Sequence, residues 1–244
     1  MEETMKLYWE TLFEEVSTEK SLRQFLNPLR GYEEEFITGA IIDIGCGQSD
    51  FLLDYANKSS KIYAIDNDGI QLDYLRKRAK VISTNNLENW EFIKLNFPVD
   101  ALPKDKFSVI ILSNILHFFS FEQCVEIEKV VDNIAECGTM IYISVHSYKF
   151  YMNDPENPDN NEYFKHYFKI EDLKYIFPKE KYEYMFVAEI DKIDSKQEIE
   201  IVNKWIDKYL AINEITDISI INEIKEDYLK NKSQSDIQVI FRKL

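Results

Sequence analysis

Two glycines close together, with an acidic residue just before them, are the first feature of the sequence that could do chemistry. Gly45 and Gly47 follow Asp43 in the run Asp43-Ile44-Gly45-Cys46-Gly47, in a chain with only six glycines. Glycine at such a turn lets the backbone pass close to a ligand and adopt a positive φ without steric cost. Because an apolar run precedes the pair and a helical pattern follows it, the sequence predicts a strand-to-helix turn that approaches a ligand.

A second acidic residue lies where the ribose of a nucleoside would bind. Asp66 directly follows the apolar run 61–65 and comes 19 residues after the second glycine. A carboxylate at that strand end can accept hydrogen bonds from both ribose hydroxyls. The alternative is a helix cap, a role that Asn67 and Asp68 could fill equally well. Asp43 favours the nucleoside site, since a purely structural strand position there would favour Val or Ile.

The nature of the nucleoside follows from the next helix. A dinucleotide loop needs a third glycine three residues after the second, where the helix N-terminus receives a pyrophosphate. That position is Asp50. A carboxylate there would repel a diphosphate, so NAD and FAD are disfavoured. A cofactor without phosphate and with a positively charged sulfonium fits better.

The elements that must position these residues alternate along the chain, which predicts an α/β fold with a parallel, doubly wound sheet. Apolar runs predict strands, and apolar residues at helical spacing predict helices. Strands are expected at 40–44, 61–65, 90–93, 107–112 and 140–145, with later extended segments at 182–190 and 236–242. Helices are expected at 5–16, 21–26, 51–56, 70–79, 121–135, 171–177, 197–209 and 218–229. Gly138 is expected to stop the helix at 121–135.

Several segments together resemble the class I S-adenosylmethionine-dependent methyltransferases. IIDIGCGQSDFLLDYA is similar to motif I, an acid and an apolar residue followed by GxGxG, and KIYAID to the second motif. KFSVIILSNILHFF resembles the fourth-strand motif, CGTMIYISV the fifth strand, and FKIEDLKYIF the segment before strand six. The resemblance spans 39–184. It departs from the family pattern at the third glycine, which is Ser49, and at the acid after strand three, which is Asn96.

The resemblance implies an enzyme with S-adenosyl-L-methionine as cofactor. It implies a Rossmann-like, seven-stranded mixed sheet with N-terminal helices and a helical insertion before the last strand. It also implies the residues that meet each part of the cofactor. The expected cofactor-binding residues are Asp43, Gly45, Cys46 and Gly47 at the methionine portion, Asp66 at the ribose, Ile65 and Asn67 beside the adenine, Asn96 and Phe97 at the adenine edge, and Ser113 and Asn114 on the floor beside the transfer site.

Methyl transfer from a sulfonium is an in-line displacement in which alignment supplies much of the rate. A general base is needed only if the nucleophile must lose a proton early. His117 just beyond strand four and His146 just past strand five are the candidates; a buried packing role is the alternative for His117. His166 is expected on the surface or in a lid. The cysteines and histidines show no metal-ligand spacing, so no metal is expected.

Some aromatic side chains are candidates for closing over the site, since ring faces attract sulfonium or ammonium groups. Tyr8, Trp9 and Tyr148 are the candidate substrate or lid residues, with ordinary core packing as the alternative. We expect an N-terminal helical cap at 1–38 and a methyltransferase domain at 39–244. Within the latter we expect a loop or lid at 148–168 and a helical insertion at 196–232. The insertion either packs on the domain, covers the substrate end or forms a dimer face.

Composition limits the partners. The formal net charge is −15 over 244 residues, with no dense basic stripe, which disfavours a nucleic-acid substrate. The three cysteines show no pairing pattern, and the sequence starts with acidic residues, so we expect a cytoplasmic protein. The sequence has no apolar run long enough to cross a membrane. We expect a monomer or a homodimer. The leading hypothesis is methylation of a small-molecule substrate. The alternatives are a catalytically silent cofactor-binding or regulatory subunit and a protein methyltransferase.

Overall fold

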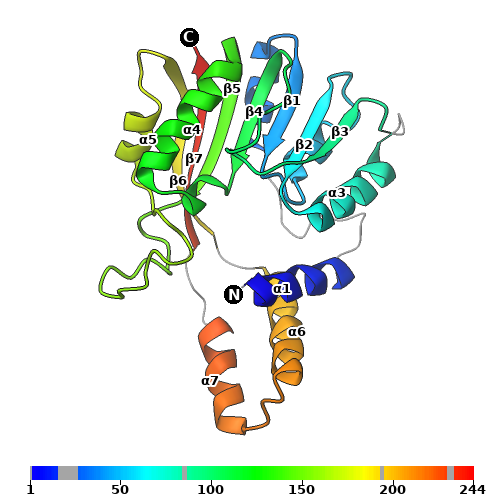
Figure 1. Ribbon diagram of the computed structural model, residues 1–244, viewed down its shortest axis with the longest axis vertical. Coiled ribbons are helices and arrows are strands. Elements are labelled where there is room, and N and C mark those ends of the chain that lie inside the picture. Colours follow the sequence, from blue (N-terminus) through cyan, green and yellow to red (C-terminus); the bar gives the residue numbers. More distant parts are fainter. Residues whose placement is uncertain (1, 16–26, 84–86, 193–194, 230–233) are drawn as a thin grey trace. The chain divides into compact units, whose positions relative to one another are not determined.

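The computed structural model describes residues 2–15, 27–83, 87–192, 195–229 and 234–244 (Figure 1). The described residues fall into two compact units. One unit contains the sheet and its covering helices, and the other contains helices α1, α6 and α7. The predicted helix at 21–26 lies outside the described residues.

A seven-stranded mixed sheet is the centre of the larger unit, as the sequence predicts. Its strand order is β3-β2-β1-β4-β5-β7-β6. The strands that the sequence predicted as parallel are parallel, and β7 pairs antiparallel with β5. The strands are β1 (Ala40–Ile44), β2 (Ile62–Asp66), β3 (Trp90–Lys94), β4 (Phe107–Ser113), β5 (Ala135–His146), β6 (Tyr182–Lys192) and β7 (Gln234–Lys243).

Helices cover both faces of this sheet. From β1 the chain moves outward to β2 and β3, then returns past β1 to β4 and β5. Right-handed crossovers therefore place the helices of the two halves on opposite faces. The helices are α2 (Asp50–Asp54), α3 (Gly69–Ile82), α4 (Phe121–Ile134) and α5 (Ile170–Ile176), with 3₁₀ helices at Pro28–Glu35 and Leu116–Phe118. Figure 1 shows α4 and α5 together on one face.

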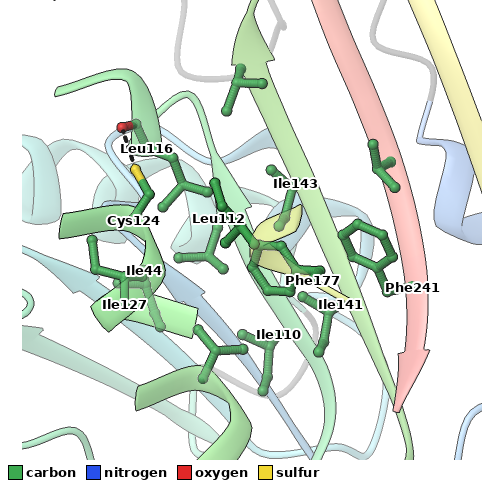
Figure 2. Close-up of a cluster of buried hydrophobic side chains, with 14 of the residues drawn as sticks. Ile44, Ile110, Leu112, Leu116, Cys124, Ile127, Ile141, Ile143, Phe177 and Phe241 are labelled. Carbon is green, nitrogen blue, oxygen red and sulfur yellow. Dashed lines mark hydrogen bonds between the residues drawn. The ribbon is translucent and has the colours of Figure 1, made fainter. Parts of the chain in front are cut away.

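The alternation of side chains along β5 shows how the two faces are filled. Ile141 and Ile143 point into a buried cluster with Ile127 of α4 and with Phe177, the residue that follows α5 (Figure 2). Tyr142, between them, faces the other way and meets Phe51 of α2, with ring centroids 4.6 Å apart. Buried on both faces, the central strands are continuous apolar runs, which is the pattern that the sequence shows.

One expected helix boundary is wrong. Helix α4 ends at Ile134, and Gly138 lies inside β5 with a φ of +92°. The register between β4 and β5 shifts at this point, where the Thr139 hydroxyl donates a 2.8 Å hydrogen bond to the carbonyl of Phe107. Gly138 thus permits an irregularity in a strand, because a positive φ suits a bulge as well as a helix end.

The second unit is a small helical assembly of α1 (Glu2–Glu15), α6 (Lys196–Ile212) and α7 (Ile218–Leu229). Trp205 of α6 is its centre: its indole donates to the carbonyl of Thr4, and Tyr8 and Tyr228 contact its ring edge-on. The predicted boundary at residue 38 differs from this grouping, since the 3₁₀ helix at Pro28–Glu35 belongs to the sheet unit.

Candidate functional site

The loop between β1 and α2 holds both glycines in left-handed conformations. Gly45 has a φ of +70° and Gly47 a φ of +48°. A side chain at Gly45 would collide with Ile115. A Cβ at Gly47 would lie 3.8 Å from Oε1 of Gln71, which is ordinary contact distance. Gly45 is therefore required by conformation and packing, whereas Gly47 leaves room for a ligand beside its backbone.

Asp43 is buried directly beneath this loop. It is 2% exposed, and its Oδ2 accepts a hydrogen bond from the hydroxyl of Ser49. Its Oδ1 has no hydrogen-bond partner among the described residues. Burial raises the pKa of Asp43 to about 8; Asp66 adds to the shift and the Ser49 hydrogen bond opposes it. An acceptor without a donor thus lies under the glycine loop.

Ser49, the departure from the third motif-I glycine, supports the loop rather than disrupting it. Besides binding Asp43, its Oγ accepts a 3.1 Å hydrogen bond from the backbone N–H of Leu52 and so caps α2. A glycine would supply neither hydrogen bond.

Asp66 joins the glycine loop to the end of β2. The N–H of Gly47 donates to Oδ2 and the N–H of Asp68 to Oδ1, each at 2.8 Å. Burial raises the pKa of Asp66, and these two donors oppose the shift. A carboxylate has about four lone-pair sites, so both oxygens can still accept hydrogen bonds from a ligand.

Asp50 is not the uncompensated carboxylate that the sequence suggested. Its Oδ1 forms a 2.8 Å ion pair with Arg78, whose side chain is buried and also donates to the carbonyl of Gln48. The carboxylate is therefore compensated, and its electrostatic repulsion of a diphosphate is weaker than the sequence suggested.

The other predicted cofactor residues lie at the carboxyl ends of the same sheet. Asn67 and Asn96 are exposed, and Phe97 is half-buried against Phe119. Ser113 ends β4, and Asn114 follows with a φ of +57°. Asn114 accepts a 3.3 Å hydrogen bond from Ser144 on β5. Cys46 is buried within the glycine loop; its N–H donates to Ile65, and burial raises its thiol pKa well above the usual value.

Gln71 is a candidate site residue that the sequence analysis did not single out. It lies on α3, is 6% exposed, and its Oε1 has no hydrogen-bond partner in the described part of the chain. Its signal was a polar residue on the inward stripe of an amphipathic helix, next to Leu72 and Leu75. This polar residue indicates a ligand site only because the structure places its side chain beside Gly47.

His117 and His146 come together at the ends of β4 and β5. Their rings are stacked, with centroids 3.9 Å apart and planes within 2°. Phe150 stacks on the other face of His146 at 3.9 Å, and Phe164 contacts both histidines edge-on. His117 is 1% exposed, and burial lowers its pKa well below the usual value. This burial agrees with the packing alternative for His117, and its role as a general base stays a prediction.

His146 has a buried acidic partner that the sequence reading did not single out. Its Nδ1 lies 2.9 Å from Oδ1 of Asp236, and the two residues are direct partners in the β5–β7 ladder. Asp236 is 3% exposed. The two residues are 90 positions apart in the sequence, so only the strand order brings them together.

The predicted lid residues lie in different surroundings. Tyr148 is 47% exposed, with the ammonium of Lys169 over its ring at 4.6 Å. Tyr8 and Trp9 contact each other edge-on within the helical unit. Their role at the substrate stays a prediction. His166 is half-buried beside Asp172, at 3.2 Å.

Sequence comparison finds one family that matches part of the chain. Residues 41–137 match the family described as methyltransferase domain. This segment carries the glycine loop, Asp66 and the end of β4. The chain therefore contains a segment similar to a methyltransferase domain, which is consistent with the class I S-adenosylmethionine-dependent methyltransferases that the sequence resembles. No curated protein sequence matches it.

Solved structures, methyltransferases among them, share the fold of this chain at low sequence identity. Coclaurine N-methyltransferase, solved with N-methylheliamine and S-adenosylhomocysteine, is 14% identical, with a TM-score of 0.63 over 98% of this chain and 85% of that one. YjhP from E. coli is 11% identical, with a TM-score of 0.65 over 98% and 100% of the two chains. An S-adenosylmethionine-dependent methyltransferase from Methanosarcina mazei is 15% identical, with a TM-score of 0.59 over 90% and 98%.

S-adenosylmethionine is the cofactor expected from the methyltransferase-domain match, and the site fits it. Two buried acceptors without donors, Asp43 Oδ1 and Gln71 Oε1, adjoin the glycine loop. The cofactor brings an ammonium, ribose hydroxyls and an adenine amine, which are the donors that such acceptors need. The binding of the ribose by Asp66 stays a prediction; Asp66 adjoins Gly47, beside whose backbone a Cβ would meet nothing closer than 3.8 Å.

The described residues contain no group of three histidine, cysteine or acidic side chains placed to hold a metal ion. Nor is any described helix long and apolar enough to cross a membrane.

Proposed function

We propose that this methyltransferase transfers the methyl group of S-adenosylmethionine to a small-molecule acceptor. The observation that carries the proposal is the 2.8 Å hydrogen bond between Gly47 N–H and Asp66, which joins both cofactor motifs at one sheet edge. Ligands of open α/β sheets bind at such an edge.

The choice of a small molecule is supported by two neighbours and by charge. Coclaurine N-methyltransferase was solved with N-methylheliamine, and geranyl diphosphate C-methyltransferase from Streptomyces coelicolor with geranyl diphosphate. The net charge of −15 disfavours nucleic acid as an acceptor. A cytoplasmic location and a monomeric or homodimeric state belong to the same proposal.

Ser49 bears on the alternative of a catalytically silent subunit. A silent subunit would be expected to have lost the parts that shape the cofactor loop. Here Ser49 adds a hydrogen bond to Asp43 and a helix cap in place of the missing glycine. This favours an active enzyme over a silent one. The protein-methyltransferase alternative rests on the acidic surface, which would attract a basic peptide.

Release of S-adenosylhomocysteine tests the proposal. The full chain is incubated with S-adenosylmethionine and separate pools of phenols, small amines and Lys/Arg-rich peptides. We expect release that depends on a phenol or amine. Release with peptides alone would establish the protein-methyltransferase alternative, and cofactor binding without release in any pool would establish the silent one.

A further inference from the structure

The stacked histidines hold their protons on opposite nitrogens. His117 Nδ1 accepts a 3.3 Å hydrogen bond from the backbone N–H of His146, so its own proton is on Nε2. His146 Nδ1 faces the carboxylate of Asp236, which only accepts, so His146 carries its proton on Nδ1. The Nε2 of His146 is therefore the nitrogen with a free lone pair.

Only one edge of the His146 ring is open to a ligand. His117 covers one face and Phe150 the other, each at a centroid distance of 3.9 Å. Asp236 occupies the Nδ1 side. The side chain is nevertheless 14% exposed, and Nε2 has no hydrogen-bond partner among the residues that the structure describes. The packing thus fixes the ring and presents Nε2.

The register of the sheet places this nitrogen on the cofactor's side. Asp43 pairs with Ile111 on β4, and Ile111 with Tyr142 on β5. Side chains alternate along a strand, so Tyr142 and His146 share the face to which Asp43 belongs. Both Asp43 and His146 lie toward the carboxyl ends of their strands. A ligand that reaches from the glycine loop along this edge meets His146 next.

We propose that His146 is a catalytic residue that accepts a proton at Nε2 from the methyl acceptor, with Asp236 and His117 as its positioning residues. This rests on the proposed function, and the acceptor is a hydroxyl or amine whose attacking atom must lose a proton. S-adenosylmethionine supplies a methyl carbon on a sulfonium: the acceptor bonds to that carbon as the C–S bond breaks and its electron pair stays on sulfur. The acceptor's proton passes to Nε2, and the carboxylate of Asp236 stabilises the resulting imidazolium.

The surroundings suit an acceptor with an apolar ring. Phe118, 40% exposed, contacts the ring of His117, and Tyr151, 42% exposed, contacts Phe150. Lys149, close to His146 in the sequence, forms an ion pair with Glu189, which also accepts a hydrogen bond from Ser147. The charges of Lys149 and Glu189 are therefore compensated. We therefore assign phenols and aryl amines as the acceptor class.

Nitrogen NMR tests the proton placement without any turnover. The chain has three histidines, so ¹⁵N-histidine labelling gives a spectrum that single substitutions assign. At a pH where the rings are neutral we expect His146 with Nδ1–H and His117 with Nε2–H. Asp236→Ala shifts His146 toward Nε2–H. Asp172→Ala, which removes the comparable partner of His166, leaves His146 unchanged. Nε2–H on His146 in the parent protein overturns the proposal.

Kinetics test the proton transfer itself. With phenols that are protonated at the assay pH, His146→Gln lowers turnover about 100-fold or more, because positioned bases contribute on that scale. With nitrophenols that ionise unaided, the loss is small. Asp236→Asn keeps the shape and the Nδ1 acceptor but removes the charge, and we expect an intermediate loss. An equal loss for every phenol, or none, overturns the proposal.

Calorimetry separates this inference from the proposed function. We expect His146→Gln and Asp236→Asn to bind S-adenosylhomocysteine within about twofold of the parent protein. Absence of binding by the parent protein contradicts the proposed function. Intact binding with the wrong His146 tautomer contradicts only the proton-acceptor role.

Discussion

Asp43 combines two properties that oppose each other in the ligand-free protein. Its burial favours the protonated form, while the site needs an acceptor for a cationic cofactor. The sequence predicted the position of this acid at the end of a buried strand. It did not predict that the hydroxyl of Ser49 donates a hydrogen bond to Asp43. Ser49 stands where the motif has a glycine, and the sequence alone does not show which buried atom the serine side chain contacts.

The raised pKa of Asp43 makes stability depend on pH. The folded pKa is about 8 and the ordinary value 3.8, so between these limits the folded protein holds a proton that the unfolded chain releases. The contribution of Asp43 to the free energy of unfolding is fully present below pH 4 and falls as pH rises toward 8. The slope is up to about 1.4 kcal/mol per pH unit.

Asp43→Asn should remove this slope, because asparagine does not titrate. We expect urea unfolding at a series of pH values to show the parent protein losing more stability than the variant between pH 5 and pH 8. Parallel curves for the two proteins would show that Asp43 is ionised throughout this range in the folded state.

At the scale of elements, β5 shows where sequence patterns stop being informative. Gly138 after a helical pattern predicts a helix end, yet the strand begins at Ala135, three residues before Gly138. A helix end and a strand bulge both accommodate a residue with a positive φ, so a glycine in the sequence does not distinguish the two. The hydrogen bond from Thr139 to Phe107 decides the outcome, and it depends on pairing with a strand 32 residues away. The regular helices and strands, set by local periodicity, were predicted to within a few residues.

Gly138→Ala should destabilise the protein by about 1–3 kcal/mol, a typical cost of a side chain in a strained conformation. Its Cβ would lie 2.7 Å from Cγ2 of Ile37, at a φ of +92°. Gly31→Ala is the matched control, since a Cβ there has nothing within 4 Å. Urea unfolding checks both, and equal midpoints for the two variants would contradict the assigned conformation of Gly138.

At the scale of the whole molecule, the sequence predicted the sheet but not the contacts between segments that are far apart in the chain. The order of motifs identified the strands and the cofactor edge. The association of α1 with α6 and α7 joins residues about 200 positions apart, as in the bond from Trp205 to Thr4. The pairing of His146 with Asp236 spans 90 positions. Such contacts depend on which apolar faces meet in the folded chain, which local periodicity does not specify.

We propose that the edge formed by Asp43, Gly47 and Asp66 binds S-adenosylmethionine. Asp66 is the residue to change, since it can accept from both ribose hydroxyls. Asp73→Ala is the control, because Asp73 is an exposed aspartate on α3 whose pair with Arg76 contributes little to stability. Circular dichroism confirms that both variants are folded.

Isothermal calorimetry with S-adenosylmethionine and S-adenosylhomocysteine is the most direct test. We predict that the parent protein and Asp73→Ala bind both ligands alike. Asp66→Ala should bind at least about 10-fold more weakly, since a hydrogen bond to a charged group contributes roughly 1.5–3 kcal/mol. No binding by the parent protein, or equal binding by the two variants, would contradict the assignment of this edge as the cofactor site.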